Sequence, residues 1–135
     1  MNGTTTQAPT VTGTTSIRNV VLVGPSGSGK SRLFDHVVDA VVPGRAARGQ
    51  TEPTTGLRAA TLSSGSVVIT LLDAPGNPDF VGEVRAGLRA ADAALFVVSA
   101  ADGADAQSRA LWHECEVVGM PRAVVITQLD ARDAD

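Results

Sequence analysis

The chain of 135 residues has very little cysteine and few aromatic side chains, and each shortage excludes a class of protein. Its one cysteine, Cys115, cannot form an internal disulfide, so the sequence fits a reducing compartment and predicts a cytoplasmic protein. Aromatic residues make up only 3% of the chain, so any core has to be built from Val, Leu, Ile and Ala. No apolar run approaches the roughly 18 residues that a membrane helix needs, and the first residues lack the features of a signal peptide. We therefore expect no membrane association.

Positive charge is also scarce, since 11 basic residues face 14 acidic ones and the formal net charge is −3. The chain lacks the basic excess that is typical of nucleic-acid binding, so we expect no direct DNA binding. With 43% apolar and 19% charged residues the composition is that of a globular protein, and the length suggests one domain. Residues 1–16 carry no charged side chain and are rich in Thr, which predicts a disordered leader ahead of a domain at 17–135.

Apolar runs and helical spacing alternate along the domain. Four apolar runs are typical of buried strands, at residues 19–23, 67–72, 93–100 and 122–130. Apolar residues at helical spacing predict three helices between them, at 31–42, 80–91 and 106–119. A further strand is expected ahead of a turn at 63–66, which is too short for a crossover and makes that pair of strands antiparallel. The order β-α-β-β-α-β-α-β predicts an α/β fold with a mostly parallel sheet and helices on both faces.

Two segments of this domain are rich in glycine. Residues 43–56 combine Pro, Gly and Thr with scattered charge and predict a mobile loop. The stretch "GPSGSGKS" fits the pattern G-x-x-x-x-G-K-[ST], between a predicted strand and a predicted helix. Its glycines let backbone N–H groups converge on a polyphosphate, Lys30 supplies positive charge, and the Ser31 hydroxyl is suited to Mg²⁺. The predicted phosphate-binding residues are Gly24, Pro25, Ser26, Gly27, Ser28, Gly29, Lys30 and Ser31.

Acidic residues end two of the predicted strands. Asp73 closes the run "VVITLLD" where a carboxylate that helps hold Mg²⁺ is expected, although a turn-forming residue before Pro75 is the alternative. Gly76 follows three residues later and could offer its N–H to a γ-phosphate. Asp130 closes "VVITQLD" at the edge where open α/β sheets bind ligands, and it is either a base-contacting acid or an ordinary exposed one.

The smaller candidates are two histidines, one cysteine and one tryptophan. His36 and His113 lie on predicted helices without a partner at metal-ligand spacing, so we interpret both as surface or packing residues. Cys115 is expected to be buried, and Trp112 to pack in the core or an interface.

Together these elements resemble the G domain of translational GTPases of the elongation factor G and elongation factor G-like family. The resemblance is carried by "GPSGSGKS" and by "DAPGNPDFVGEVRAGLRAADAALFVVSAADGADAQSRALWHECEVVGMPRAVVITQLD", and it covers about 19–130. It implies a partial P-loop G domain that binds GTP and GDP with Mg²⁺ as cofactor. Ser31 and Asp73 are implied as metal ligands, Gly76 as the γ-phosphate sensor and Asp130 as the reader of guanine.

The sequence departs from the family pattern at several positions. Thr127-Gln128-Leu129-Asp130 stands where the family has Asn-Lys-x-Asp for the base, and Asn77 stands in place of the hydrolytic histidine. Arg58 aligns near the family's Mg²⁺-binding Thr, for which Thr54 or Thr55 could substitute if the loop shifts register. The sequence stops at Asp135, before the last base-contacting loop of the family. We expect either the front part of a G domain or a decayed stand-alone copy.

These features leave three hypotheses open. The first is slow GTP hydrolysis, with Lys30 and Asn77 as the catalytic candidates. The second is a nucleotide-binding pseudo-GTPase with little hydrolysis or base selectivity, and the third is an inactive fragment. The ribosome is an expected partner only in a full-length context.

Overall fold

The computed structural model describes residues 13–41 and 56–131. The predictions for residues 1–12 and for residues 43–55 of the predicted loop, with Thr54 and Thr55, lie outside this part of the chain, as do the last four residues. Thr14–Ser16, placed by the sequence in the leader, form a short 3-10 helix, η1.

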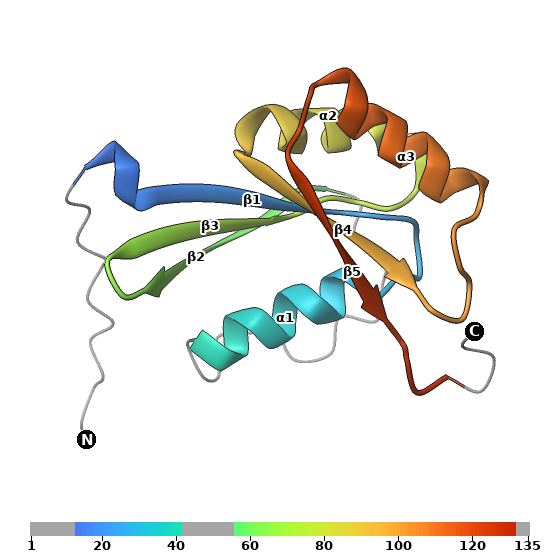
Figure 1. The fold of residues 1–135 in the computed structure, drawn as a ribbon, viewed down its shortest axis with the longest axis horizontal. Coiled ribbons are helices and arrows are strands. Elements are labelled where there is room, and N and C mark those ends of the chain that lie inside the picture. Colours follow the sequence, from blue (N-terminus) through green and yellow to red (C-terminus); the bar gives the residue numbers. More distant parts are fainter. Residues whose placement is uncertain (1–12, 42–55, 132–135) are drawn as a thin grey trace.

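The described strands form one five-stranded sheet in the order β2-β3-β1-β4-β5 (Figure 1). All neighbours are parallel except β2 and β3, whose hairpin turns at Gly65, which confirms the predicted antiparallel pair. The parallel strands place their carboxyl ends at one edge, where ligand sites of open α/β sheets lie. The strands are β1 (Ile17–Val23), β2 (Arg58–Ser64), β3 (Val67–Asp73), β4 (Ala93–Ser99) and β5 (Arg122–Thr127).

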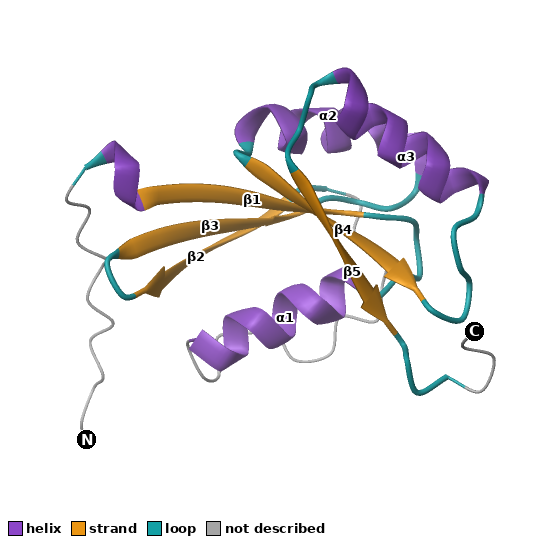
Figure 2. Ribbon diagram, in the orientation of Figure 1, coloured by secondary structure: helices purple, strands orange, loops and turns teal. Residues whose placement is uncertain are grey.

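Helices cover both faces of this sheet, as predicted: α1 lies on one face and α2 and α3 lie on the other (Figure 2). The helices are α1 (Lys30–Val41), α2 (Val81–Ala90) and α3 (Ala106–Val117), and a 3-10 turn, η2 (Pro78–Phe80), precedes α2. Within the residues that the structure describes, no helix is both long and apolar enough to span a membrane.

The core consists of two apolar layers separated by the sheet. Side chains of β1 alternate between them, so Val21 and Val23 pack with α2 and α3 while Leu22 packs with α1. This two-sided burial explains the unbroken apolar run of the strand. Cys115 on α3 is fully buried, as expected, and Trp112 packs edge-on against Phe96 with ring centroids 5.2 Å apart.

The prediction of a buried strand at 122–130 was wrong in two respects. The strand ends at Thr127, and it lies at the edge of the described sheet, paired only with β4. Val124 and Ile126 are therefore 52% and 55% exposed. The apolar run records strand propensity, but burial depends on neighbours that a single run does not specify.

Candidate functional site

The glycine-rich loop connects the carboxyl end of β1 to the first turn of α1, so the predicted strand–loop–helix context is present. Gly24, Pro25 and Ser28 are buried, whereas Ser26 and Gly27 are exposed at the tip. Gly27 and Gly29 have φ values of 82° and 85°, in the left-handed region that favours glycine. The loop therefore curls tightly, with its exposed tip at the start of a helix, where N–H groups are available to an anion.

Lys30 lies inside this loop, where it is only 5% exposed. Its Nζ donates a 2.8 Å hydrogen bond to the carbonyl oxygen of Pro25. Burial lowers the pKa of Lys30 to about 8, against the opposing effect of the nearby Asp73 carboxylate. The ammonium group is thus held under the loop and is only partly compensated by protein charge.

Asp73 ends β3 next to the loop and is fully buried. Ser31 Oγ donates a 2.9 Å hydrogen bond to Asp73 Oδ2 across 42 residues of sequence. Asp73 Oδ1 is buried and has no hydrogen-bond partner among the described residues. Burial raises the pKa of Asp73, while the Ser31 hydrogen bond and the charges of Arg58 and Lys30 oppose that shift. An unsatisfied buried carboxylate oxygen is costly and points to a missing ligand.

This pair of oxygen ligands fits Mg²⁺. A hydroxyl and a carboxylate are the hard donors that Mg²⁺ prefers, and the open Oδ1 of Asp73 leaves a position for a ligand or a bound water. The described residues contain no group of three His, Cys, Asp or Glu side chains that could cage a metal. Mg²⁺ at phosphate sites ordinarily keeps only one or two protein ligands and takes the rest from phosphates and water. The donor set is therefore suited to a metal ion that is shared with a phosphate.

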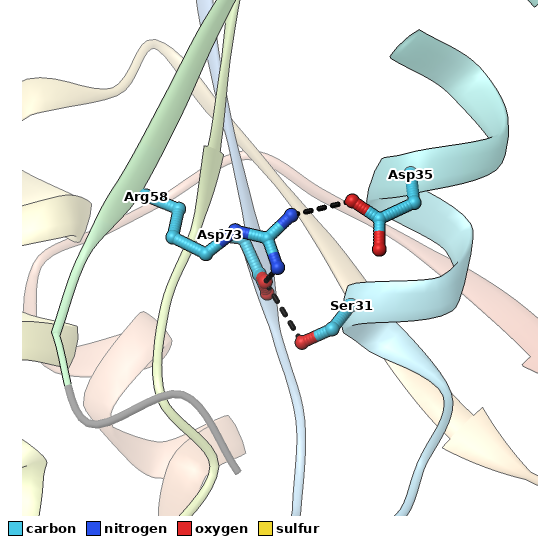
Figure 3. Close-up of polar contacts among 4 residues, drawn as sticks. All are labelled: Ser31, Asp35, Arg58 and Asp73. Carbon is cyan, nitrogen blue, oxygen red and sulfur yellow. Dashed lines mark hydrogen bonds and ion pairs between the residues drawn. The ribbon is translucent and has the colours of Figure 1, made fainter. Parts of the chain in front are cut away.

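Arg58 brings a second cation to the same carboxylate (Figure 3). Its Nη1 lies 3.9 Å from Asp73 Oδ2, and its Nη2 lies 2.6 Å from Asp35 Oδ1 on α1. From the sequence, Arg58 was named only because it aligns near the family's Mg²⁺-binding Thr, and Asp35 was not identified. The register of the hairpin contained the missing signal, because Arg58 pairs directly with Asp73 across the two strands.

Gly76 packs against the phosphate loop. A Cβ added there would lie 2.6 Å from both Lys30 Nζ and Ser26 N. Only a residue without a side chain allows this approach, and the carbonyl oxygen of Gly76 accepts a hydrogen bond from Gln107 Nε2. The structure therefore brings Gly76 to the loop, as its predicted role requires.

Asn77 has a local partner. Its Oδ1 accepts a 3.0 Å hydrogen bond from the backbone N–H of Asp79, which caps η2. The side chain is half-buried and already serves the turn that leads into α2.

At the end of β5, two polar side chains donate hydrogen bonds to the glycine-rich loop. Thr127 Oγ1 donates a 2.6 Å hydrogen bond to the carbonyl oxygen of Ser28, and Gln128 Nε2 donates a 2.7 Å hydrogen bond to that of Gly27. Gln128 adopts a φ of 56°, uncommon for a residue other than glycine. Asp130 lies two residues further on, exposed in a turn. Thr127 and Gln128 thus join the predicted site, and Asp130 remains at its open margin.

The strand–loop–helix unit, the buried lysine within it and the carboxylate on the neighbouring strand define an α/β domain of the P-loop class. Residues 45–135 match the family described as the elongation factor Tu GTP binding domain, and the chain belongs to this family. The resemblance to translational GTPases noted from the sequence is confirmed.

Two curated relatives show where in the family the chain lies. It is 48% identical to the elongation factor G-like protein of Mycobacterium tuberculosis (strain ATCC 25618 / H37Rv) over 138 residues, covering 91% of this chain and 19% of the relative. It is 28% identical to elongation factor G 2 of Borreliella burgdorferi, covering 89% of this chain and 20% of the relative. The chain therefore spans about a fifth of the length of these proteins.

Solved structures agree with this fold. A crystal structure of a protein from Thermus thermophilus matches with a TM-score of 0.78 and 38% identity, covering 85% of this chain and 20% of that one. Translation elongation factor SelB from Methanococcus maripaludis, solved in complex with the GTP analogue GppNHp, matches with a TM-score of 0.71 and 26% identity. That match covers 84% of this chain and 22% of SelB.

Proposed function

We propose that this domain binds GTP and GDP together with Mg²⁺ and hydrolyses GTP slowly. The observation that carries the proposal is the convergence of Lys30, Ser31 and Asp73 at one glycine-rich loop, with Gly76 packed on the same loop. The GTP analogue bound to the related SelB supports a guanine nucleotide as the ligand.

The roles of the individual residues follow from their positions. Loop N–H groups and the Lys30 ammonium bind the β- and γ-phosphates, because the hydrogen bond from Lys30 to Pro25 already holds the ammonium group at the loop. Ser31 and Asp73 hold Mg²⁺, which when bound neutralises charge on the phosphate oxygens. Gly76, which packs on the same loop, presents its N–H to the γ-phosphate. Their contribution to hydrolysis is positioning and electrostatic stabilisation, which by themselves give slow turnover.

Recognition of the base is assigned to the segment after β5. The exposed carboxylate of Asp130 is available to accept hydrogen bonds from guanine. Thr127 and Gln128 donate hydrogen bonds to the carbonyl oxygens of Ser28 and Gly27. These side chains therefore stabilise the loop and do not contact the base. We therefore expect guanine preference to be present but weak.

A second candidate function, a pseudo-GTPase that binds without turnover, is favoured by one observation. The Asn77 amide oxygen already caps η2 through Asp79 N, so it is committed to local structure. Asn is also not titratable near neutral pH and cannot accept a proton from water as a general base.

Single-turnover hydrolysis separates these two candidates. The 135-residue chain is mixed with a limiting amount of radiolabelled GTP and Mg²⁺, and Asn77→Ala is compared with the unmodified chain. Slow turnover that falls by about tenfold in the variant supports hydrolysis with Asn77 positioning water. Binding without turnover in either protein establishes the pseudo-GTPase. Melting temperatures check that loss of the cap has not unfolded the variant.

The relatives are named elongation factors, and the wider role of this chain is proposed on that basis. We propose that the domain acts as the nucleotide-binding part of a cytoplasmic translation factor. Engagement of the ribosome is assigned to the full-length context, since the relatives are about five times longer than this chain.

A further inference from the structure

Arg58 is held in place by several contacts beside the proposed nucleotide site. It begins β2 and stands directly opposite Asp73 in the hairpin register. Asp35 on α1 binds one end of its guanidinium at 2.6 Å, and the group lies 4.5 Å from the centre of the Phe34 ring. The planar cation is therefore held between a strand and a helix, with its other nitrogen turned to Asp73 (Figure 3).

The carboxylate oxygen that Arg58 approaches is the one that accepts the Ser31 hydroxyl. Nη1 of Arg58 is 3.9 Å from Asp73 Oδ2, and Ser31 Oγ is 2.9 Å from the same oxygen. Asp73 is fully buried and the Arg58 side chain is 21% exposed, so solvent screens this pair less than it screens a surface ion pair. A divalent cation bound to Asp73 and Ser31 would therefore lie close to the positive charge of Arg58 and be repelled by it.

We propose that Arg58 is a built-in counter-cation of Asp73 that competes with Mg²⁺ and lowers the dependence of nucleotide binding on the metal. This inference rests on the proposed function, because it takes Asp73 as a metal ligand of a nucleotide site. Without metal, Arg58 shields incoming phosphates from the Asp73 carboxylate. With metal, Arg58 repels the divalent cation and weakens its hold.

The plainer alternative is that Arg58 only fastens β2 to α1. Its contacts with Asp35 and Phe34 are sufficient for that purpose. Under the alternative, loss of Arg58 changes stability and changes nucleotide affinity equally with and without metal. Under the proposal, the two affinities move in opposite directions, since removal of the cation exposes the phosphates to Asp73 but frees Asp73 for Mg²⁺.

The test measures the dissociation constant of fluorescent GDP with excess Mg²⁺ and with excess EDTA, for the unmodified 135-residue chain and for variants. Arg58→Gln removes the charge, Arg58→Lys keeps it, and Arg85→Gln is the matched control. Arg85 pairs with Glu114 at 2.7 Å on the helices α2 and α3, so its loss removes the same charge outside the site. Binding of Mn²⁺ without nucleotide, followed by electron paramagnetic resonance, gives a direct metal readout.

We expect Arg58→Gln to raise the ratio of the EDTA constant to the Mg²⁺ constant by roughly tenfold and to tighten Mn²⁺ binding, as loss of one partly buried charge implies. Arg58→Lys should stay near the unmodified chain, and Arg85→Gln should not change the ratio. An unchanged ratio in Arg58→Gln overturns the inference while leaving the proposed function standing. No nucleotide binding by the folded, unmodified chain overturns both. If Arg58→Gln does not fold, Arg58→Met, which keeps an apolar contact for Phe34, replaces it.

Discussion

The proposed phosphate end of the site consists of backbone and buried charged groups, whereas the proposed base end consists of exposed side chains. At the phosphate end, Lys30 and Asp73 are buried, and Gly76 touches the loop through backbone alone. At the base end, Asp130 is exposed beyond an edge strand whose outer side chains Val124 and Ile126 are half exposed. Backbone donors and buried charges tolerate few substitutions, whereas exposed side chains can change without loss of the fold. This difference agrees with the sequence of the chain, in which the phosphate-loop pattern is complete and the base-recognition motif is altered.

The two ends are not independent, because two hydrogen bonds connect the proposed base end to the phosphate loop. Thr127 and Gln128 come from the altered base motif, yet they bind carbonyl oxygens of the phosphate loop. The residues at these positions therefore support the phosphate loop, although they depart from the family's base motif. The experiments below either separate the two ends further or show that they act as one unit.

The largest effect is expected from Lys30→Ala. Lys30 is the one lysine in the sequence and it supplies the buried positive charge under the loop. Its loss should weaken GDP binding by about 100-fold or more, as removal of a hydrogen-bonded charge at a buried ion pair does. Isothermal titration calorimetry measures the change. Retained affinity in a folded variant would mean that the phosphates bind elsewhere.

The next effect concerns backbone packing at the phosphate end. Gly76→Ala places a methyl group 2.6 Å from Lys30 Nζ and Ser26 N, so the loop has to move. We expect at least a roughly tenfold weaker GDP affinity and a loss of about 1–3 kcal/mol in the free energy of unfolding. Gly82→Ala is the control, because nothing lies within 4 Å of its added Cβ and the residue is in the first turn of α2. The control should keep its GDP affinity, and its free energy of unfolding should rise by less than about 1 kcal/mol.

A smaller effect is expected at the base end. Thr127→Asn combined with Gln128→Lys restores the family pattern and should raise the preference for GTP over ATP by several-fold, about 1 kcal/mol. Competition of GTP and ATP for a fluorescent nucleotide measures the preference. No gain would place Asp130 away from the base, and weaker binding of both nucleotides would show that the native pair matters chiefly as a support of the loop.

The smallest effect is a pH dependence set by Lys30. Its pKa of about 8 lies below the roughly 10.4 of an unfolded lysine, so burial disfavours the charged form. This cost to folding is present below about pH 8 and disappears as pH rises toward roughly 10.4. Phosphates favour the charged form, so GDP should raise the Lys30 pKa and its affinity should fall as pH rises above about 8. NMR of labelled lysine follows this single residue with and without GDP. An identical pKa in both states would contradict the contact.

Much of this architecture follows from the sequence because its signals are local. Short patterns predicted the order of strands and helices along the chain, the loop between β1 and α1 and the position of Asp73 at a strand end. The exposure of β5 did not follow, because it depends on which elements lie beside the strand. The bonds of Thr127 and Gln128 to the loop span about 100 residues of sequence, and no local signal marks them. The Arg58–Asp73 pairing lies between these cases, since it required only the hairpin register.

Calorimetric titration of the 135-residue chain with Mg²⁺-GDP, Mg²⁺-GTP and Mg²⁺-ATP tests the central claim most directly. An intact phosphate end with a weakened base end predicts that all three nucleotides bind, with the two guanine nucleotides several-fold tighter than ATP. Circular dichroism establishes beforehand that the chain is folded. Absence of binding by the folded chain, with all three nucleotides, would contradict the assignment of the loop at Gly24–Ser31 as a working nucleotide site.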